Sequence, residues 1–144
     1  MVDDARTAIS AMVERETEAW NRKDAAALVQ LFHPDMVWPW PPSEDAHDPM
    51  SWIMPMGRFD AQRWRSAWQT LFDTHALVSN DRVIRRIETT AEGDGGFAVV
   101  DIETRWRSNV NGEEQVWKGR ACKVYALCTD GWKITMHTGL LAYE

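Results

Sequence analysis

The sequence predicts an α+β domain, with N-terminal helices that pack on an antiparallel sheet formed by the C-terminal half. Up to about residue 77 the apolar residues recur at steps of three and four, the spacing of a buried helix face. Beyond that point the period changes to two, and three turn signals divide the segment: "EGDGG", Asn111-Gly112 and Asp130-Gly131. The expected strands lie near 82–91, 97–109, 114–128 and 132–142. Because the meander needs a helical cover, residues 1–144 are expected to form one domain.

Three helices are expected before the sheet. Asp3 or Asp4 can cap the first helix, which carries a mostly apolar stripe. The stripe consists of Ile9, Met12, Val13, Glu16, Ala19 and Trp20. Asp24 can cap the second helix, and Pro34 is expected to end it.

The segment between the second and third helices, residues 33–59, holds all six prolines and three of the nine tryptophans. Prolines keep such a segment extended, and its aromatic side chains could wall an apolar pocket. A loop that plugs the open end of the fold and leaves no cavity is the alternative. The third helix follows after the cap Asp60, where Phe59 and Trp64 occupy the two positions of a hydrophobic staple.

The composition, with 44% hydrophobic and 26% charged residues and a net charge of −6, is that of a globular protein. The acidic balance disfavours nucleic acid as a partner, because phosphates need clustered Lys and Arg. No apolar run approaches the roughly 18–20 residues of a membrane span, and the N-terminus lacks the pattern of a signal peptide. We therefore expect a cytoplasmic protein without a membrane partner. The run Glu44–Asp48 lacks a spacing that fixes a metal geometry, and we expect no metal and no cofactor.

Two-residue turns at the second and third turn signals would fix which residues lie opposite one another. Counting outward places Glu103 opposite Arg120, Asp101 opposite Cys122, and Val124 opposite His137. One face would then carry Asp101, Glu103, Arg105, Arg120, Cys122, Val124 and His137. The other face would carry Val100, Ile102, Trp106, Trp117, Lys123, Tyr125, Leu127, Ile134 and Met136.

Two interpretations of these faces stay open. In the first, the apolar face packs on the helices and the charged face meets water, where its ion pairs contribute little. In the second, the charged face lines a cavity, and the face that carries Trp106 and Trp117 is covered by a second subunit. The two interpretations predict different burial for these tryptophans.

Several stretches resemble one known family. The chain resembles the nuclear transport factor 2-like superfamily in "AWNRKDAAALVQLFHPDMVW", "GRFDAQRWRSAW" and "RACKVYALCTDGWKITMH". It is most similar to the SnoaL-like group, with polyketide cyclases, ketosteroid isomerase, scytalone dehydratase and the association domain of calcium/calmodulin-dependent protein kinase II. The most specific matches are Arg120 with Val124-Tyr125, the run "DGWKI", and Gly57-Arg58.

The resemblance covers nearly the whole chain and implies a cone-shaped, cystatin-like fold with a curved sheet. It also implies a pocket between the sheet and the helices, and a homodimer through the convex side of the sheet. In the kinase association domain, basic residues at positions like Arg105 and Lys123 line the pocket, although the predicted register puts these two on opposite faces. The base aspartate of ketosteroid isomerase falls nearest Trp40, so that mechanism is not supported.

Candidate catalytic residues come from the charged face. His137 beside Glu103 or Asp101 could move protons, and Glu103 with Arg120 could orient a polar group. Asp101 beside the apolar Cys122 could have a raised pKa and act as a base. The candidate catalytic residues are Asp101, Glu103, Arg120 and His137. The candidate ligand-binding residues are Trp20, Trp38, Trp40, Trp52, Met54, Arg105 and Tyr125.

Two functions follow as hypotheses. The first is a cofactor-free enzyme that isomerises, cyclises or dehydrates a small, apolar, oxygenated molecule by acid–base chemistry. The second is a ligand-binding or dimerisation module with a pocket but no chemistry. Purely structural roles for the same residues stay open as well, because solvated ion pairs and a buried structural histidine would produce the same pattern.

Overall fold

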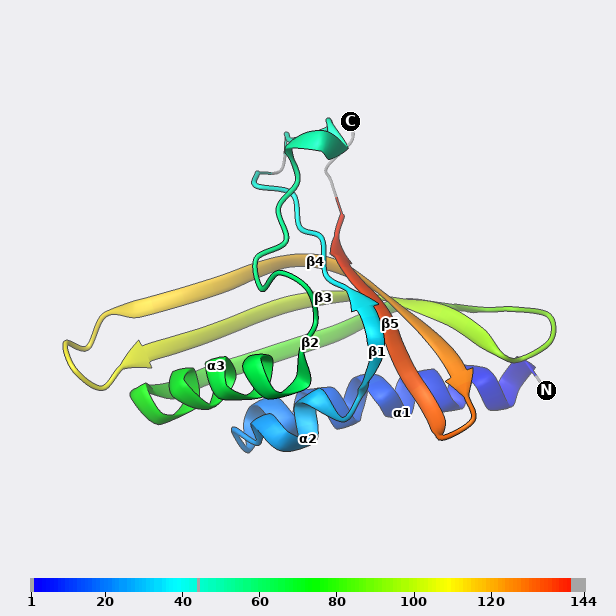
Figure 1. The fold of residues 1–144 in the computed structure, drawn as a ribbon, viewed down its shortest axis with the longest axis horizontal. Helices are drawn as coiled ribbons and strands as arrows, with labels where there is room; N and C mark the ends of the chain where they lie inside the picture. The colour runs from blue at the N-terminus through cyan, green and yellow to red at the C-terminus, as the bar shows by residue number, and fades with distance from the viewer. Residues whose placement is uncertain (1, 44, 141–144) are drawn as a thin grey trace.

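A computed structural model of the protein describes residues 2–43 and 45–140. The helical elements are α1 (Val2–Asn21), α2 (Ala25–Val29), the short 3-10 helix η1 (Pro49–Ser51) and α3 (Ala61–Thr74). The strands are β1 (Phe32–Val37), β2 (His75–Thr89), β3 (Gly95–Ser108), β4 (Glu114–Cys128) and β5 (Gly131–Gly139). The predicted α+β class, with N-terminal helices on a curved sheet, is confirmed (Figure 1). None of the helices in the described residues is long and apolar enough to cross a membrane.

The sheet has the order β1-β5-β4-β3-β2. Strands β2 to β5 form the predicted antiparallel meander, and β1 adds a parallel neighbour to β5. All three helices lie against the same side of the sheet (Figure 1), where α1 packs on β2 and β3. The space between this inner face and the helices therefore holds the core.

The helices follow from local sequence signals. The predicted stripe of α1 is buried along its whole length, Glu16 included. The carboxylate of Asp24 accepts a hydrogen bond from the backbone nitrogen of Ala27 at 3.0 Å, which confirms the predicted cap of α2. Asp60 caps α3 in the same way, and the rings of Phe59 and Trp64 lie 5.0 Å apart, as the hydrophobic staple requires.

Three predicted boundaries are wrong. Helix α1 begins at Val2, so neither Asp3 nor Asp4 stands outside it as a cap. Helix α2 ends at Val29, and Pro34 lies in β1 instead of terminating the helix. An edge strand tolerates proline because one of its sides needs no hydrogen-bond donor. Strand β2 begins at His75 directly after α3, well before the expected start near residue 82.

The predicted register is also wrong, because the turn between β3 and β4 is longer than two residues. The backbone nitrogen of Ser108 donates to the carbonyl oxygen of Glu113 at 2.8 Å, which leaves four residues, 109–112, in the turn. Asp101 therefore lies opposite Arg120, and Glu103 lies opposite Lys118. Because the shift is an even number of residues, the predicted separation of the two faces of β3 and β4 survives.

A β-bulge in β5 changes the face of His137. The pairing moves from Tyr125–Ile134 to Val124–Met136, so Thr135 is an extra residue in β5. Beyond the bulge His137 lies opposite Lys123 rather than Val124. His137 is thus on the inner, helix-covered face, and its predicted place among Asp101 and Glu103 is wrong.

The proline-rich segment projects from the end of the sheet. In Figure 1 it leaves β1, reaches η1 at its tip and returns to α3. Trp40 and Ile53 exchange two backbone hydrogen bonds, at 2.8 and 3.0 Å, which join the outgoing and returning parts of the segment. The base of this projection stands where the inner face of the sheet comes to an end, next to Gly139.

Candidate functional site

A cavity of about 440 Å³ lies between the inner face of the sheet and the helices. Its size falls within the range of roughly 300–1,000 Å³ that small-molecule sites occupy. The lining is mostly apolar: it includes five tryptophans, together with three residues that have charged side chains and one histidine. The lining residues are Glu16, Trp20, Trp38, Trp40, Pro55, Met56, Trp68, Arg82, Ile102, Val116, Trp117, Lys118, Gly119 and His137.

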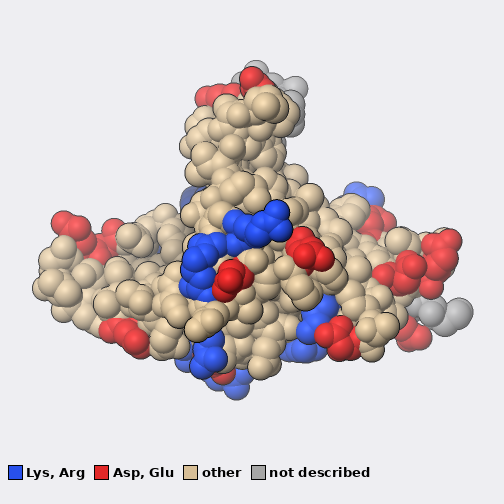
Figure 2. Space-filling view, in the orientation of Figure 1, with Lys and Arg blue, Asp and Glu red and all other residues tan. Residues whose placement is uncertain are grey.

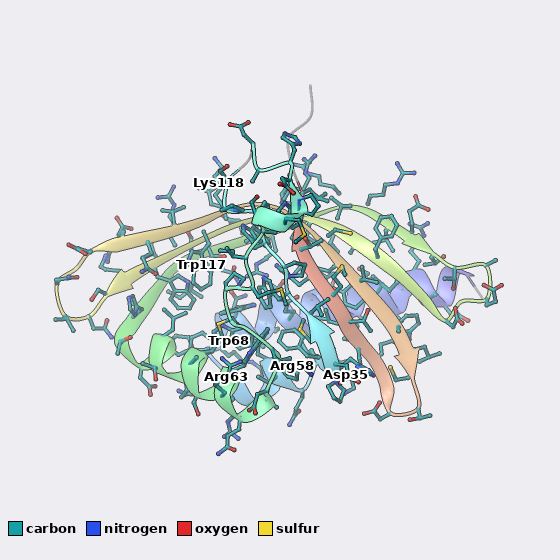
Figure 3. The ribbon with its side chains drawn as sticks, turned by 45° about the horizontal axis from the view of Figure 1, so that its top comes forward. Asp35, Arg58, Arg63, Trp68, Trp117 and Lys118 are labelled. Carbon is teal, nitrogen blue, oxygen red and sulfur yellow. The ribbon has the colours of Figure 1, made fainter. Side chains whose placement is uncertain are left out.

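The cavity reaches an edge of β4 that no described strand pairs with. The pairing of β4 with β5 extends only to Ala121–Gly139, so within residues 2–43 and 45–140 no strand pairs with residues 114–119 of β4 on that side. Four consecutive residues of this edge line the cavity, Val116 to Gly119. In Figure 3 Trp117 lies on the helix side of this strand, toward Trp68 of α3, and Lys118 lies on the opposite side.

Trp40 closes the cavity against two glycines. A methyl group added to Gly139 would come within 3.1 Å of the indole of Trp40, and one added to Gly119 within 3.7 Å. A side chain at Gly139 would require Trp40 and Pro41 to move away by a few tenths of an ångström. The base of the projecting segment is therefore seated on the sheet beside the cavity.

A buried ionic group stands at the inner end of the cavity. The ammonium of Lys123 donates a hydrogen bond of 2.6 Å to the carboxylate of Glu16, and neither side chain is more than 3% exposed. The guanidinium of Arg82 lies 3.6 Å from the other oxygen of Glu16. Burial raises the pKa of Glu16, but the charges of Lys123 and Arg82 outweigh it and lower the pKa to about 2. Burial lowers the pKa of Lys123 to about 8 against the opposing pull of Glu16, so the two form an ion pair at neutral pH.

Further polar groups hold this ionic group in place. The indole nitrogen of Trp20 donates to Glu16 at 3.3 Å, and the ring of Trp20 lies 5.7 Å from the guanidinium carbon of Arg82. The Nε of Arg82 donates to the side-chain oxygen of Asn80 at 3.1 Å, and the hydroxyl of Thr104 donates to the same oxygen. These contacts restrict the rotamers of Glu16 and Arg82, so residues of α1, β2 and β3 together fix the geometry of the ionic group.

His137 sits between two tryptophans. Its ring centre lies 3.9 Å from that of Trp38 and 5.6 Å from that of Trp40, with which it is stacked. Burial lowers the pKa of His137 well below its usual value, and the charge of Lys123 lowers it further. The imidazole is therefore neutral at physiological pH and faces the cavity as a weak base.

Two buried polar atoms have no hydrogen-bond partner in the described part of the chain: the phenol oxygen of Tyr125 and the indole nitrogen of Trp106. Burial raises the pKa of Tyr125 well above its usual value, with Glu16 acting in the same direction, so the phenol keeps its proton. Neither residue belongs to the cavity lining, and their rings fill the core behind it.

Three of the four candidate catalytic residues lie on the outer face of the sheet. Asp101 accepts hydrogen bonds from Arg120 at 2.6 Å and from Arg85 at 2.7 Å, all three being partly exposed. Glu103 pairs with Arg105 at 3.0 Å on the same face. The expected raised pKa of Asp101 is wrong, because the hydrogen bonds from Arg120 and Arg85 hold the pKa well below its usual value. The charged face thus meets water, as the first interpretation of the faces predicted.

The candidate ligand-binding residues divide in two. Trp20, Trp38 and Trp40 line the cavity as expected. Trp52 instead donates from its indole to the carbonyl of Ala46 within the projecting segment, and Met54 is 44% exposed there. Tyr125 lies behind the cavity, and Arg105 lies on the outer face.

Sequence reasoning missed Glu16, Arg82 and Lys123 as one group. The signal was present in part, since Glu16 interrupts an apolar helix stripe and Lys123 interrupts an apolar strand face. A charge at such a position needs a buried partner. The described residues contain no group of three or more His, Cys, Asp or Glu side chains arranged to hold a metal ion.

The family of the chain follows from a match to a family model. Residues 13–137 match the SnoaL-like domain, and the chain belongs to this family, as the resemblance implied. The search of curated proteins finds no match.

Solved structures with the same fold include three informative examples. A ketosteroid isomerase-like protein from Erwinia carotovora atroseptica aligns with a TM-score of 0.66 and 14% identity over 92% of each chain. An NTF2-like protein of unknown function in nutrient uptake from Rhodospirillum rubrum aligns with a TM-score of 0.66 and 17% identity, over 94% of this chain and 98% of the other. A domain with a cystatin-like fold from Nostoc punctiforme aligns with a TM-score of 0.65 and 13% identity, over 100% of this chain and 81% of the other. At these identities the likeness establishes the fold alone.

Proposed function

We propose that the protein binds a small, mostly apolar, oxygenated molecule in the cavity and that His137 transfers a proton on it. The observation that supports this proposal is a neutral imidazole, held between two indoles and exposed to a tryptophan-lined cavity. A general base must be unprotonated and within reach of its substrate. His137 is neutral and lines the cavity. The reaction class is isomerisation, cyclisation or dehydration, which the protein's own side chains can perform.

The simplest step of this class is an isomerisation. The free ring nitrogen of His137 takes a proton from a carbon next to a carbonyl group, and the electron pair of that C–H bond moves onto the carbonyl oxygen as an enolate. The imidazolium then returns the proton to another carbon of the conjugated system, so atoms and charge balance. Arg82 and Lys123, which lower the pKa of His137, also favour the negative charge of the enolate.

The test is hydrogen–deuterium exchange at carbon. Cyclohex-2-enone and 1-tetralone are incubated in heavy water with the protein, and nuclear magnetic resonance follows the loss of the α-protons. We expect exchange above the buffer rate, and we expect His137→Gln to lower the added rate by roughly a hundredfold. His33→Gln is the matched control, because His33 lies on β1 and does not line the cavity. An exchange rate equal in wild type and His137→Gln would exclude His137 as the base.

A second candidate function is ligand binding without turnover. One observation favours it: of the candidate catalytic residues only His137 lines the cavity, and the carboxylate of Glu16 is already engaged by Lys123. In this case native mass spectrometry of freshly purified protein would reveal extra mass that disappears on denaturation, while the exchange assay stays at the buffer rate.

The homodimer stays a prediction that comes from the family resemblance. The face that carries Trp106 and Tyr125 is covered by the protein's own helices, so it needs no second subunit. A dimer would instead use the outer face, where the ion pairs of Asp101 lie beside the exposed Val83. Light scattering at micromolar concentration would give twice the monomer mass if it forms, and a monomer mass would exclude it.

A further inference from the structure

The charges that line the cavity do not balance. Among the described residues at the inner end of the cavity, Glu16 carries a negative charge, while Arg82 and Lys123 carry positive charges. The single carboxylate of Glu16 is engaged most closely by Lys123, which lies behind it at 2.6 Å. Arg82 therefore has only the longer contact of 3.6 Å with Glu16, beyond hydrogen-bond distance.

The guanidinium of Arg82 has donors to spare. Its side chain is only 6% exposed, so water cannot fully solvate it. Of its five N–H donors, the one on Nε reaches Asn80, and the planar group rests near the ring of Trp20. Since Arg82 also lines the cavity, its remaining donors are available to a molecule bound there. A buried guanidinium without an equal counter-charge is costly, and an anion in the cavity would offset that cost.

Among the described residues, the neighbouring titratable groups do not supply the missing negative charge. His137 is neutral, and Tyr125 keeps its proton because burial raises the pKa of its phenol. Figure 2 shows basic and acidic side chains next to one another in the middle of the visible face, below the projecting segment, so the surface there does not carry a single sign of charge. The positive excess is that of the buried Arg82 and Lys123 over the single carboxylate of Glu16.

We propose that the ligand is an aromatic monocarboxylate whose carboxylate is bound by the free N–H donors of Arg82 and whose ring lies among the indoles of the cavity. The planar fork of a guanidinium matches the two oxygens of a carboxylate. Trp38, Trp68 and Trp117 supply the apolar surface for the ring. This inference rests on the proposed function in one respect, namely that the cavity binds a small molecule.

The experiment compares two probes of the same shape. Calorimetric titration of the full chain with naphthalene-1-carboxylate and with the neutral naphthalene-1-carboxamide isolates the charge. We expect the carboxylate to bind roughly ten- to a hundredfold more tightly, as a charge-assisted hydrogen bond to a buried partner provides. Arg82→Met should remove this preference and leave the amide affinity within about threefold, since Glu16 and Lys123 remain paired.

Arg85→Met is the matched control, because it removes the same charge from the same strand on the outer face. It should keep the preference for the carboxylate. Equal affinity of wild type for the two probes would overturn the inference even if Arg82→Met failed to fold, and so would a preference that survives Arg82→Met. Carboxylate binding that chloride abolishes at equal concentration would also overturn it, because the site would then accept any small anion.

The outcomes separate this inference from the proposed function. If both probes bind with equal affinity, the cavity still binds small molecules, and only the proposed recognition of a carboxylate is excluded. Binding of neither probe would overturn the inference together with the aromatic pocket. Proton exchange catalysed by His137 is measured independently of both.

Discussion

Each side of the sheet has one carboxylate bound by two cations, but the two ionic groups differ in how far water reaches them. On the inner face Glu16 is bound by Lys123 and Arg82, and on the outer face Asp101 is bound by Arg120 and Arg85. The shortest contact is 2.6 Å in both groups. The Lys123 side chain is 0% exposed, whereas that of Arg120 is 53% exposed.

This difference decides what each group can do. Water and salt screen the outer charges, so their geometry is good but their contribution is small. Inside, the low dielectric makes every charge felt by its neighbours, and removal of one partner leaves an uncompensated charge. That is why the inner group alters the pKa of His137 and gives the cavity its positive character, while the outer group acts on no site.

The largest expected effect comes from removal of the inner carboxylate. Glu16→Gln leaves Lys123 and Arg82 buried without a counter-charge, and we expect a loss of about 3–5 kcal/mol in the free energy of unfolding. Urea denaturation at neutral pH measures it. Glu18→Gln, on the exposed side of the same helix, is the control and should change little. If Glu16→Gln proved as mild as Glu18→Gln, the inner group would contribute no more than a surface pair.

An intermediate effect is expected from pH. The pKa of His137 is lowered in the folded protein from its usual value of 6.5, so below that pH the unfolded chain binds a proton that the folded one excludes. Stability should therefore fall as the pH drops below about 6.5, by at most about 1.4 kcal/mol per pH unit for this one group. Glu16, with a pKa lowered from 4.5 to about 2, adds a further loss between those two values.

His137→Gln separates the two contributions. The variant should lack the decline that starts near pH 6.5 and keep the one that starts near 4.5. Denaturation midpoints measured across this range give the two slopes. A decline of equal steepness in both proteins above pH 5 would mean that His137 becomes protonated in the folded state without cost.

The local features of the fold, and the three tryptophans Trp20, Trp38 and Trp40 of the cavity lining, could be predicted from the sequence. The caps Asp24 and Asp60 and the buried stripe of α1 depend on residues close in sequence, so their spacing reveals them. The face of His137 depends on one extra residue in β5, Thr135, which leaves no mark in the period-two pattern. Strand register over such a distance is set by turn length and bulges, and the error in the face of His137 arose from the bulge.

The inner ionic group was hidden for a related reason. Its members come from α1, β2 and β4, and only the packed fold brings Glu16, Arg82 and Lys123 together. The sequence contains many carboxylates and cations, and the outer set with Asp101 and Arg120 looked equally suitable for chemistry. Pairing between strands predicted contacts but not which side of the sheet the helices would cover.

The smallest expected effect is the most direct comparison of the two faces. Asp101→Asn removes the carboxylate that Arg120 and Arg85 share, but both guanidinium groups stay in water, where their charges are screened. We expect a shift in the urea midpoint close to the error of the measurement, shrinking further at roughly 0.5 M salt. Naphthalene-1-carboxylate binding should be unchanged, because the outer face does not reach the cavity. A loss as large as that of Glu16→Gln would mean that something in solution, such as the second subunit that the family resemblance implies, buries the outer face.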